Sequence, residues 1–116
     1  MKIFKEIEEV EGTLIEWRRD LHSHPELAFE EHHTAKFVAK KLREFNIDVE
    51  ENIAGTGVVG TLRKGSGNLA VGLRADLDAL PIHEGNNFSH KSKNPGKMHA
   101  CGHDGHTTML LGAAQY

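Results

Sequence analysis

The spacing of apolar residues changes its period near residue 46, and this change constrains the fold more than any other feature. From Ile3 to about His22, and again from about Glu30 to Phe45, apolar side chains recur every three or four positions, which is typical of amphipathic helices. Alternating runs at 47–50 and 57–62 then predict strands, and the apolar run 69–73 is typical of a central strand covered on both faces. The order of helices and strands predicts a layered α/β domain.

The last third of the chain predicts a long loop followed by a helix. Residues 81–97 are polar and rich in turn formers, and long loops in compact domains are often functional. Residues 107–114 are typical of the start of a buried helix, and the chain stops at Tyr116 with no cap, glycine or proline to end it. We therefore expect residues 1–116 to be the N-terminal portion of a larger domain.

Composition excludes several classes of protein. Fourteen basic and seventeen acidic residues give a formal charge of −3, which predicts no nucleic-acid partner. The longest apolar runs span only a few residues, so we expect no membrane span. The N-terminus lacks the apolar stretch of a secretory signal, which predicts a cytoplasmic location, and one cysteine permits no internal disulfide.

A cysteine and a histidine two residues apart are the strongest candidates for metal ligands. Cys101 and His103 flank Gly102 just before the predicted helix, and a tight glycine-containing loop can direct both side chains at one ion. Thiolate and imidazole suit zinc and also accept manganese, cobalt or nickel. The alternative is a buried small thiol beside a helix-capping loop. His106 follows about one helical turn later and is a candidate for the pocket or the scaffold.

Two aspartates follow the predicted central strand. Ligands of open α/β sheets bind beyond the carboxyl ends of strands, which is where Asp76 and Asp78 lie. Arg74 alternates with them, so all three side chains can share one side of a continued strand. The alternative is that one aspartate caps the following turn or pairs with Arg74.

Two further groups of polar residues favour structural roles. His22 and His24 resemble part of a metal site, but Pro25 suits the first turn of a helix, and imidazoles beside such a turn commonly bond to backbone. Glu30 and Glu31 predict a solvated helix face. We therefore rank these residues below the Cys101–His103 pair.

Three stretches, 17–27, 72–82 and 96–107, carry a family resemblance. They resemble the amidohydrolase branch of metallopeptidase family twenty, which includes hippurate hydrolases, N-acyl-amino-acid amidohydrolases and indole-acetyl-amino-acid hydrolases. The resemblance runs from about Glu16 to the last residue, with the motifs in the family's order.

The resemblance implies a catalytic α/β domain with a central mixed sheet and flanking helices that holds two divalent metal ions. A lid domain, which lies outside this sequence, often serves dimerisation in the family and would allow a homodimer here. By the family pattern Cys101 and His103 are ligands, and Cys101 bridges the two ions. Asp78 matches the acidic residue of the catalytic centre that orients a ligand, whereas Asp76 stands where other branches have a ligand histidine.

The implied reaction is hydrolysis of the amide that joins an acyl group to an amino acid. Water activated by the metals attacks the carbonyl, and a glutamate acts as general base. That glutamate and the remaining ligands follow after Tyr116 in family members, so we expect the 116-residue chain alone to be inactive. The alternative is a non-catalytic remnant or a metal-binding or interaction module. A dipeptidase or carboxypeptidase is less favoured, because those branches usually carry a histidine at the position of Asp76 and lack the Cys-Gly-His run.

Overall fold

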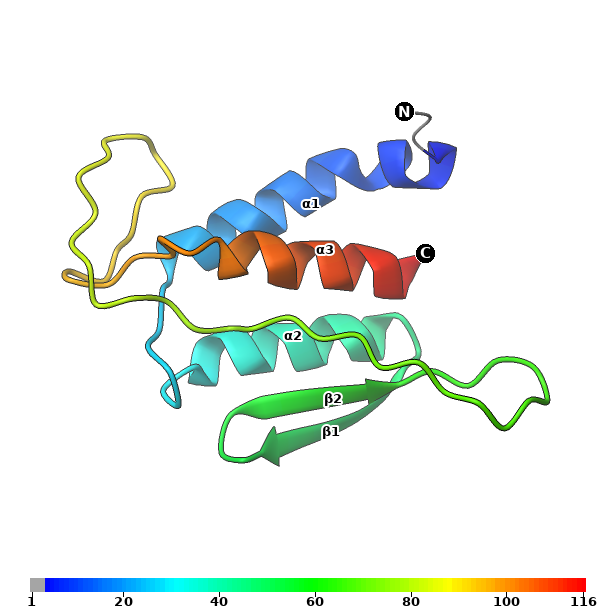
Figure 1. Cartoon of the computed structure of the whole chain (residues 1–116). Coiled ribbons are helices and arrows are strands. Elements are labelled where there is room, and N and C mark those ends of the chain that lie inside the picture. The colour runs from blue at the N-terminus through cyan, green and yellow to red at the C-terminus, as the bar shows by residue number, and fades with distance from the viewer. Residues whose placement is uncertain (1–3) are drawn as a thin grey trace.

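The computed structural model describes residues 4–116 and contains three helices and two strands (Figure 1). In chain order these are α1 (Lys5–Ser23), α2 (His32–Glu44), β1 (Asp48–Ile53), β2 (Gly57–Thr61) and α3 (His103–Gln115). The predicted helices and the two alternating strands are confirmed, and with them the α/β class. The predicted start of the first helix at Ile3 lies outside the described residues.

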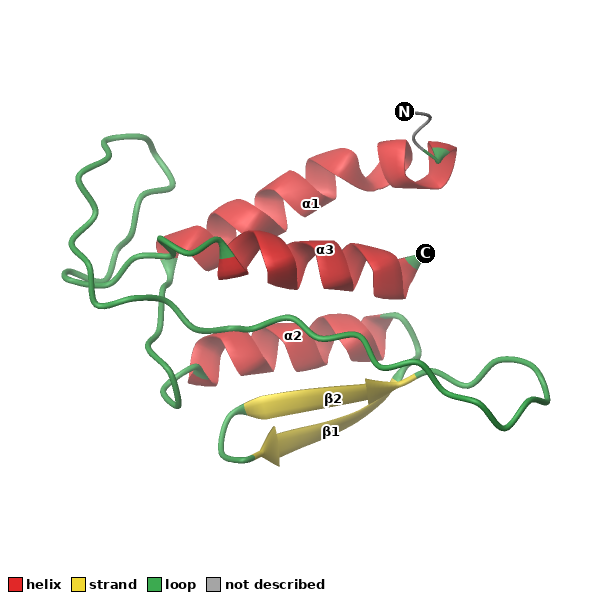
Figure 2. Ribbon diagram, in the orientation of Figure 1, coloured by secondary structure: helices red, strands yellow, loops and turns green. Residues whose placement is uncertain are grey.

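The three helices lie side by side with α3 in the middle, and the β1–β2 hairpin packs on α2 (Figure 2). Leu21 of α1, Ala39 of α2 and Leu111 of α3 are each at most 2% exposed and form the centre of the core. Trp17 packs its ring against Phe37 and Phe45 of the second helical segment, with ring centroids 6.3 and 6.1 Å away. The amphipathic faces predicted by the helical spacing are therefore the faces that pack.

The hairpin is antiparallel, and Asp48 lies opposite Thr61. A glycine in β2 allows its close packing on α2. A Cβ atom at Gly60 would lie 3.1 Å from both Leu42 and Ile47, closer than most carbon contacts, so a larger residue would push the strand away.

The prediction of a buried central strand over 69–73 is wrong for this structure. The segment follows a turn at residues 65–68 and crosses back over the molecule as an extended chain (Figure 1), but it belongs to no sheet among residues 4–116. Leu69, Val71 and Leu73 are 95%, 88% and 69% exposed. An apolar run becomes a central strand only when neighbouring strands pair with both of its edges, and the described sheet consists of β1 and β2 alone.

The predicted solvated face at the start of α2 is only half correct. Glu30 is exposed, but Glu31 is buried and accepts a hydrogen bond from the Thr56 hydroxyl, which lies in the turn between β1 and β2. Glu31, the N-cap residue of α2, therefore anchors the hairpin to the helix. No helix among residues 4–116 is long and apolar enough to span a membrane.

Two short backbone contacts hold the chain after the extended segment. Ala79 forms a parallel bridge with Leu27, and Leu80 forms an antiparallel bridge with Met98. The predicted long loop 81–97 is confirmed as a loop and closes between these anchors. The second bridge places the segment that leads to Cys101 beside Asp78, although the two are far apart in sequence.

Candidate metal centre

The side chain of His103 is fixed by Asp78 in a way that suits a metal ligand. The Nδ1 atom of His103 lies 2.9 Å from the carbonyl oxygen of Asp78 and 3.0 Å from its carboxylate oxygen Oδ1. Both partners only accept, so Nδ1 carries a proton and donates it, and in the neutral ring Nε2 then has a free electron pair. Metal-bound histidines usually donate their other nitrogen to a carboxylate or a backbone carbonyl in this manner.

Cys101 lies on the same turn and is exposed. Gly102 between the two residues has φ 89°, a left-handed conformation that glycine adopts readily, and it serves as the N-cap of α3. The helix begins at His103, next to Asp104, near which the sequence predicts its N-terminal end, so that histidine belongs to its first turn. The alternative interpretation of Cys101 as a buried thiol is wrong.

The pair does not complete a metal site by itself. Among residues 4–116 no group of three or more histidine, cysteine, aspartate or glutamate side chains lies close enough to hold one ion. Cys101 and His103 offer a soft thiolate and an imidazole, the donors that zinc and related ions accept, so they fit part of a metal centre. Their roles as ligands stay predictions.

Asp76 pairs with Arg74, as the alternative interpretation of this segment expected. The Nε and Nη2 atoms of Arg74 lie 2.9 and 2.6 Å from Oδ1 of Asp76. The hydrogen bond from Arg74 lowers the pKa of the Asp76 carboxyl, and the nearby His103 and His106 add to this effect. The backbone carbonyl of Asp76 accepts a hydrogen bond from Thr107, which ties this segment to α3.

His106 lies beside the candidate ligand. Its ring centroid is 5.6 Å from that of His103, and the residue is exposed. The structure thus brings Asp76, Asp78, His103 and His106 to the N-terminal end of α3, with Cys101 on the turn that precedes it. Their joint role as a ligand set stays a prediction.

A buried polar network next to this region was not expected from the sequence. His22 is 3% exposed, and its Nδ1 lies 2.7 Å from Oδ2 of Asp104. Its Nε2 lies 3.0 Å from Oε1 of Glu84 in the long loop. The prediction that His22 bonds to backbone is therefore wrong, while His24 does lie 2.9 Å from the carbonyl oxygen of Asp20.

Glu84 is the most strongly perturbed acid of the network. Burial by itself raises the pKa of this carboxyl, but hydrogen bonds from Asn86, from His22 and from the backbone of Ser92 outweigh burial and hold the pKa at about 2. Glu84 is therefore ionised at neutral pH although the residue is only 8% exposed. The sequence shows Glu84 as a single glutamate in a polar loop, and no local pattern predicts its burial or its lowered pKa.

His99 is a second buried histidine near the network. It is 4% exposed, its ring centroid is 6.4 Å from that of His22, and neither ring nitrogen has a hydrogen-bond partner among residues 4–116. Burial lowers the pKa of His99, so the ring is neutral at pH 7. An unpaired buried polar group costs roughly 1–3 kcal/mol, and this site therefore carries a local instability.

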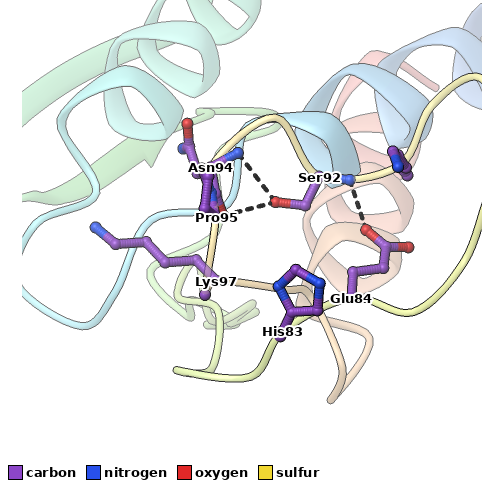
Figure 3. A pocket seen from close by; sticks show the side chains of 8 residues that line it. His83, Glu84, Ser92, Asn94, Pro95 and Lys97 are labelled. Carbon is purple, nitrogen blue, oxygen red and sulfur yellow. Dashed lines mark hydrogen bonds between the residues drawn. The ribbon is translucent and has the colours of Figure 1, made fainter.

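The long loop lines a separate small open cavity of about 190 Å³ (Figure 3). The backbone N–H of Ser92 donates to Glu84, and the Ser92 hydroxyl bonds to the backbone of Asn94 at the cavity wall. None of the predicted site residues lines it; its walls are formed by His83, Glu84, Lys91, Ser92, Asn94, Pro95, Gly96 and Lys97.

Comparison with known proteins places these motifs in one family. Residues 72–116 match the model of peptidase family M20/M25/M40. Over its whole length the chain is 53% identical to the hippurate hydrolase of Campylobacter jejuni, and it covers 30% of that protein. Over 94% of its length it is 50% identical to an N-acyl-L-amino acid amidohydrolase of Geobacillus stearothermophilus, of which it covers 30%. Thermostable carboxypeptidase 1 of Saccharolobus solfataricus is 46% identical over 97% of the chain, which covers 29% of that protein.

Solved structures agree. A Bacillus subtilis protein described as a dinuclear metal binding peptidase from the M20 family superimposes with a TM-score of 0.88 and 41% identity. The match covers 93% of this chain and 31% of that protein. The chain thus spans about 30% of the length of the relatives and solved structures that it matches.

Proposed function

Because the chain belongs to peptidase family M20/M25/M40, we propose that residues 1–116 form the N-terminal part of the catalytic domain of a metal-dependent amidohydrolase. The proposed reaction is hydrolysis of the amide bond of N-acetyl, N-benzoyl or indole-acetyl amino acids. The observation that carries the proposal is the orientation of His103, whose Nδ1 donates to Asp78 and so leaves Nε2 available to a metal ion, two residues after the exposed Cys101. The hippurate hydrolase and N-acyl-L-amino acid amidohydrolase among the relatives support the substrate class.

In this proposal each residue near the N-terminus of α3 has a distinct task. The Cys101 thiolate and His103 Nε2 hold metal, and Asp78 fixes the His103 ring so that its free nitrogen points toward the ion. Two divalent ions of zinc, manganese, cobalt or nickel, when bound, polarise the amide carbonyl and acidify a water molecule. Further ligands and the general-base glutamate would have to come from outside residues 1–116.

The remaining residues of the region are proposed to line the pocket. Asp76 is held by Arg74 and keeps its negative charge at neutral pH, since the pKa of its carboxyl is lowered. His106 lies beside His103 and is exposed. A cytoplasmic location and a homodimer formed through a lid domain are also parts of the proposal.

The test is metal analysis together with a screen of N-acetyl, N-benzoyl and indole-acetyl amino acids on the complete gene product. We expect Cys101→Ala to abolish amide hydrolysis and to lower the bound metal. Lys36→Ala, at an exposed position of α2, is the control and should keep both. Full activity and full metal content in Cys101→Ala would refute the ligand assignment.

A carboxypeptidase is the second candidate, because the 46% identical relative from Saccharolobus solfataricus bears that name. The same screen separates the two when it includes unblocked dipeptides and N-blocked dipeptides. Preference for release of a C-terminal amino acid from a peptide would favour the carboxypeptidase. A complete gene product that binds metal but hydrolyses none of these compounds would favour a non-catalytic metal-binding module.

A further inference from the structure

One buried histidine joins three segments that are far apart in the sequence. His22 is in the last turn of α1, Glu84 is in the long loop, and Asp104 is in the first turn of α3. The ring of His22 lies between the two carboxylates, with 2.7 Å from Nδ1 to Asp104 and 3.0 Å from Nε2 to Glu84. The exposed fractions of the three side chains are 3% or less.

The two carboxylate contacts assign a hydrogen to each ring nitrogen, since the 2.7 Å contact of Nδ1 with Asp104 is much shorter than its 3.4 Å contact with Nη2 of Arg18. Ionised carboxylates only accept hydrogen bonds, so both contacts exist together when His22 donates from Nδ1 and from Nε2. Charge-assisted hydrogen bonds of this kind, shielded from water, are stronger than neutral ones. Removal of one partner leaves a buried charge unpaired, which is costly. The arrangement is therefore well defined and resists distortion.

Asp104 connects the buried His22 with the candidate ligands. It directly follows His103, it forms an ion pair with Arg18 at 3.0 Å between Nε and Oδ2, and it accepts a hydrogen bond from the backbone N–H of Gly105 at 2.9 Å. Asp104 is 1% exposed, so the atoms packed around its side chain hold it in one position. Because it lies in the first turn of α3, its position determines where the helix starts relative to Asp78.

We propose that His22 is a positioning residue for the Cys101–His103 pair and acts through its hydrogen bond to Asp104. The inference rests on the proposed function, because it concerns the metal ligands of that site. The contact with Glu84 holds the long loop and has no part in this action. The two nitrogens of one ring therefore have separate roles.

Two amide substitutions separate the two roles. The side-chain N–H₂ of asparagine takes the place of Nδ1 of histidine, and that of glutamine takes the place of Nε2. His22→Asn therefore keeps the bond to Asp104 and loses the one to Glu84, while His22→Gln does the reverse. Each variant loses one buried hydrogen bond to a carboxylate, so the two are matched in what they cost the fold. Thermal unfolding of each measures that cost directly.

The first readout is the ring of His103 in the metal-free chain, followed by ¹⁵N NMR of the imidazole nitrogens. The wild type and His22→Asn should show one tautomer with the proton on Nδ1. His22→Gln should show a mixture, because His103 no longer keeps its register with Asp78. Identical His103 spectra in both variants would overturn the inference, and so would equal disturbance in both, which would indicate a purely structural role.

The second readout is titration of the metal-free complete gene product with Co²⁺, monitored by the thiolate-to-cobalt absorption band. We expect His22→Gln to weaken cobalt binding by about tenfold or more, and His22→Asn to stay within about twofold of the wild type. Equal affinities in both variants would overturn the inference. A wild-type chain without the thiolate band would instead refute Cys101 as a ligand, and the NMR readout would still decide the role of His22.

Discussion

Replacing Glu84 with glutamine should remove a pH-dependent part of the stability of this chain. The pKa of Glu84 is about 2 in the folded protein, against 4.5 for an unperturbed glutamate. Stabilisation by this group is therefore complete above about pH 5 and is lost as the pH falls through the folded-state value near 2. A pKa lowered to this extent corresponds to roughly 3 kcal/mol of unfolding free energy.

The size of the change in unfolding free energy follows from the hydrogen bonds that glutamine can form at this position. Glutamine resembles the neutral acid, and its N–H₂ group must replace one carboxylate oxygen, either Oε1, which accepts from Asn86 and His22, or Oε2, which accepts from the Ser92 backbone. We expect Glu84→Gln to lower the unfolding free energy by about 3 kcal/mol at pH 7. Near pH 2.5 the difference from the wild type should shrink to less than about 1 kcal/mol, because that pH lies close to the folded-state pKa of about 2 and most of the stabilisation by the ionised form has been lost.

Urea unfolding at several pH values, followed by fluorescence of the single tryptophan, Trp17, measures this difference. Glu44→Gln is the control, since Glu44 is an exposed acid that pairs with Lys41 at 2.8 Å. Its effect should stay small at every pH, as for other surface ion pairs. A Glu84→Gln cost that is the same at pH 7 and pH 2.5 would refute the reasoning, because it would show that the ionised form is not the one stabilised.

Three further predictions concern single side chains. His99→Leu should raise the unfolding free energy by about 1 kcal/mol, since it removes a buried imidazole whose nitrogens are unpaired among residues 4–116; a loss measured by urea unfolding would contradict this. Glu26→Ala should cost about 1–2 kcal/mol and reduce helical circular dichroism, because its carboxylate accepts from the N–H of His33 and of Thr34 at the start of α2; unchanged stability would be the contrary result. Asp78→Asn should weaken Co²⁺ binding about tenfold with little change in melting temperature, and unaltered affinity would show that Asp78 does not orient His103.

The same carboxylate of Glu26 illustrates how far sequence reasoning reaches. The pKa of Glu26 is lowered even though burial acts to raise it, because backbone N–H groups of α2 donate to it. The cap of this helix thus comes from Glu26, seven positions before His33, whereas a sequence search for an N-cap looks at the residue next to the helix. The helix was predictable and its cap was not.

The sequence by itself determined the local elements of this protein. The periods of the apolar residues predict α1, α2 and the two strands, because each period reflects the geometry of its own backbone. The spacing Cys101-Gly102-His103 before a helix identified the candidate ligands for a related reason, since a glycine between them permits the sharp turn that α3 needs at its start.

Only the tertiary structure decided which distant groups meet. The contact between Asp78 and His103 spans 25 positions and that between His22 and Asp104 spans 82. Such pairs depend on how the helices pack, and no local pattern encodes them. The same reason explains why residues 69–73 are exposed and not buried. An apolar run shows that a segment can enter a sheet, but partner strands decide whether it does.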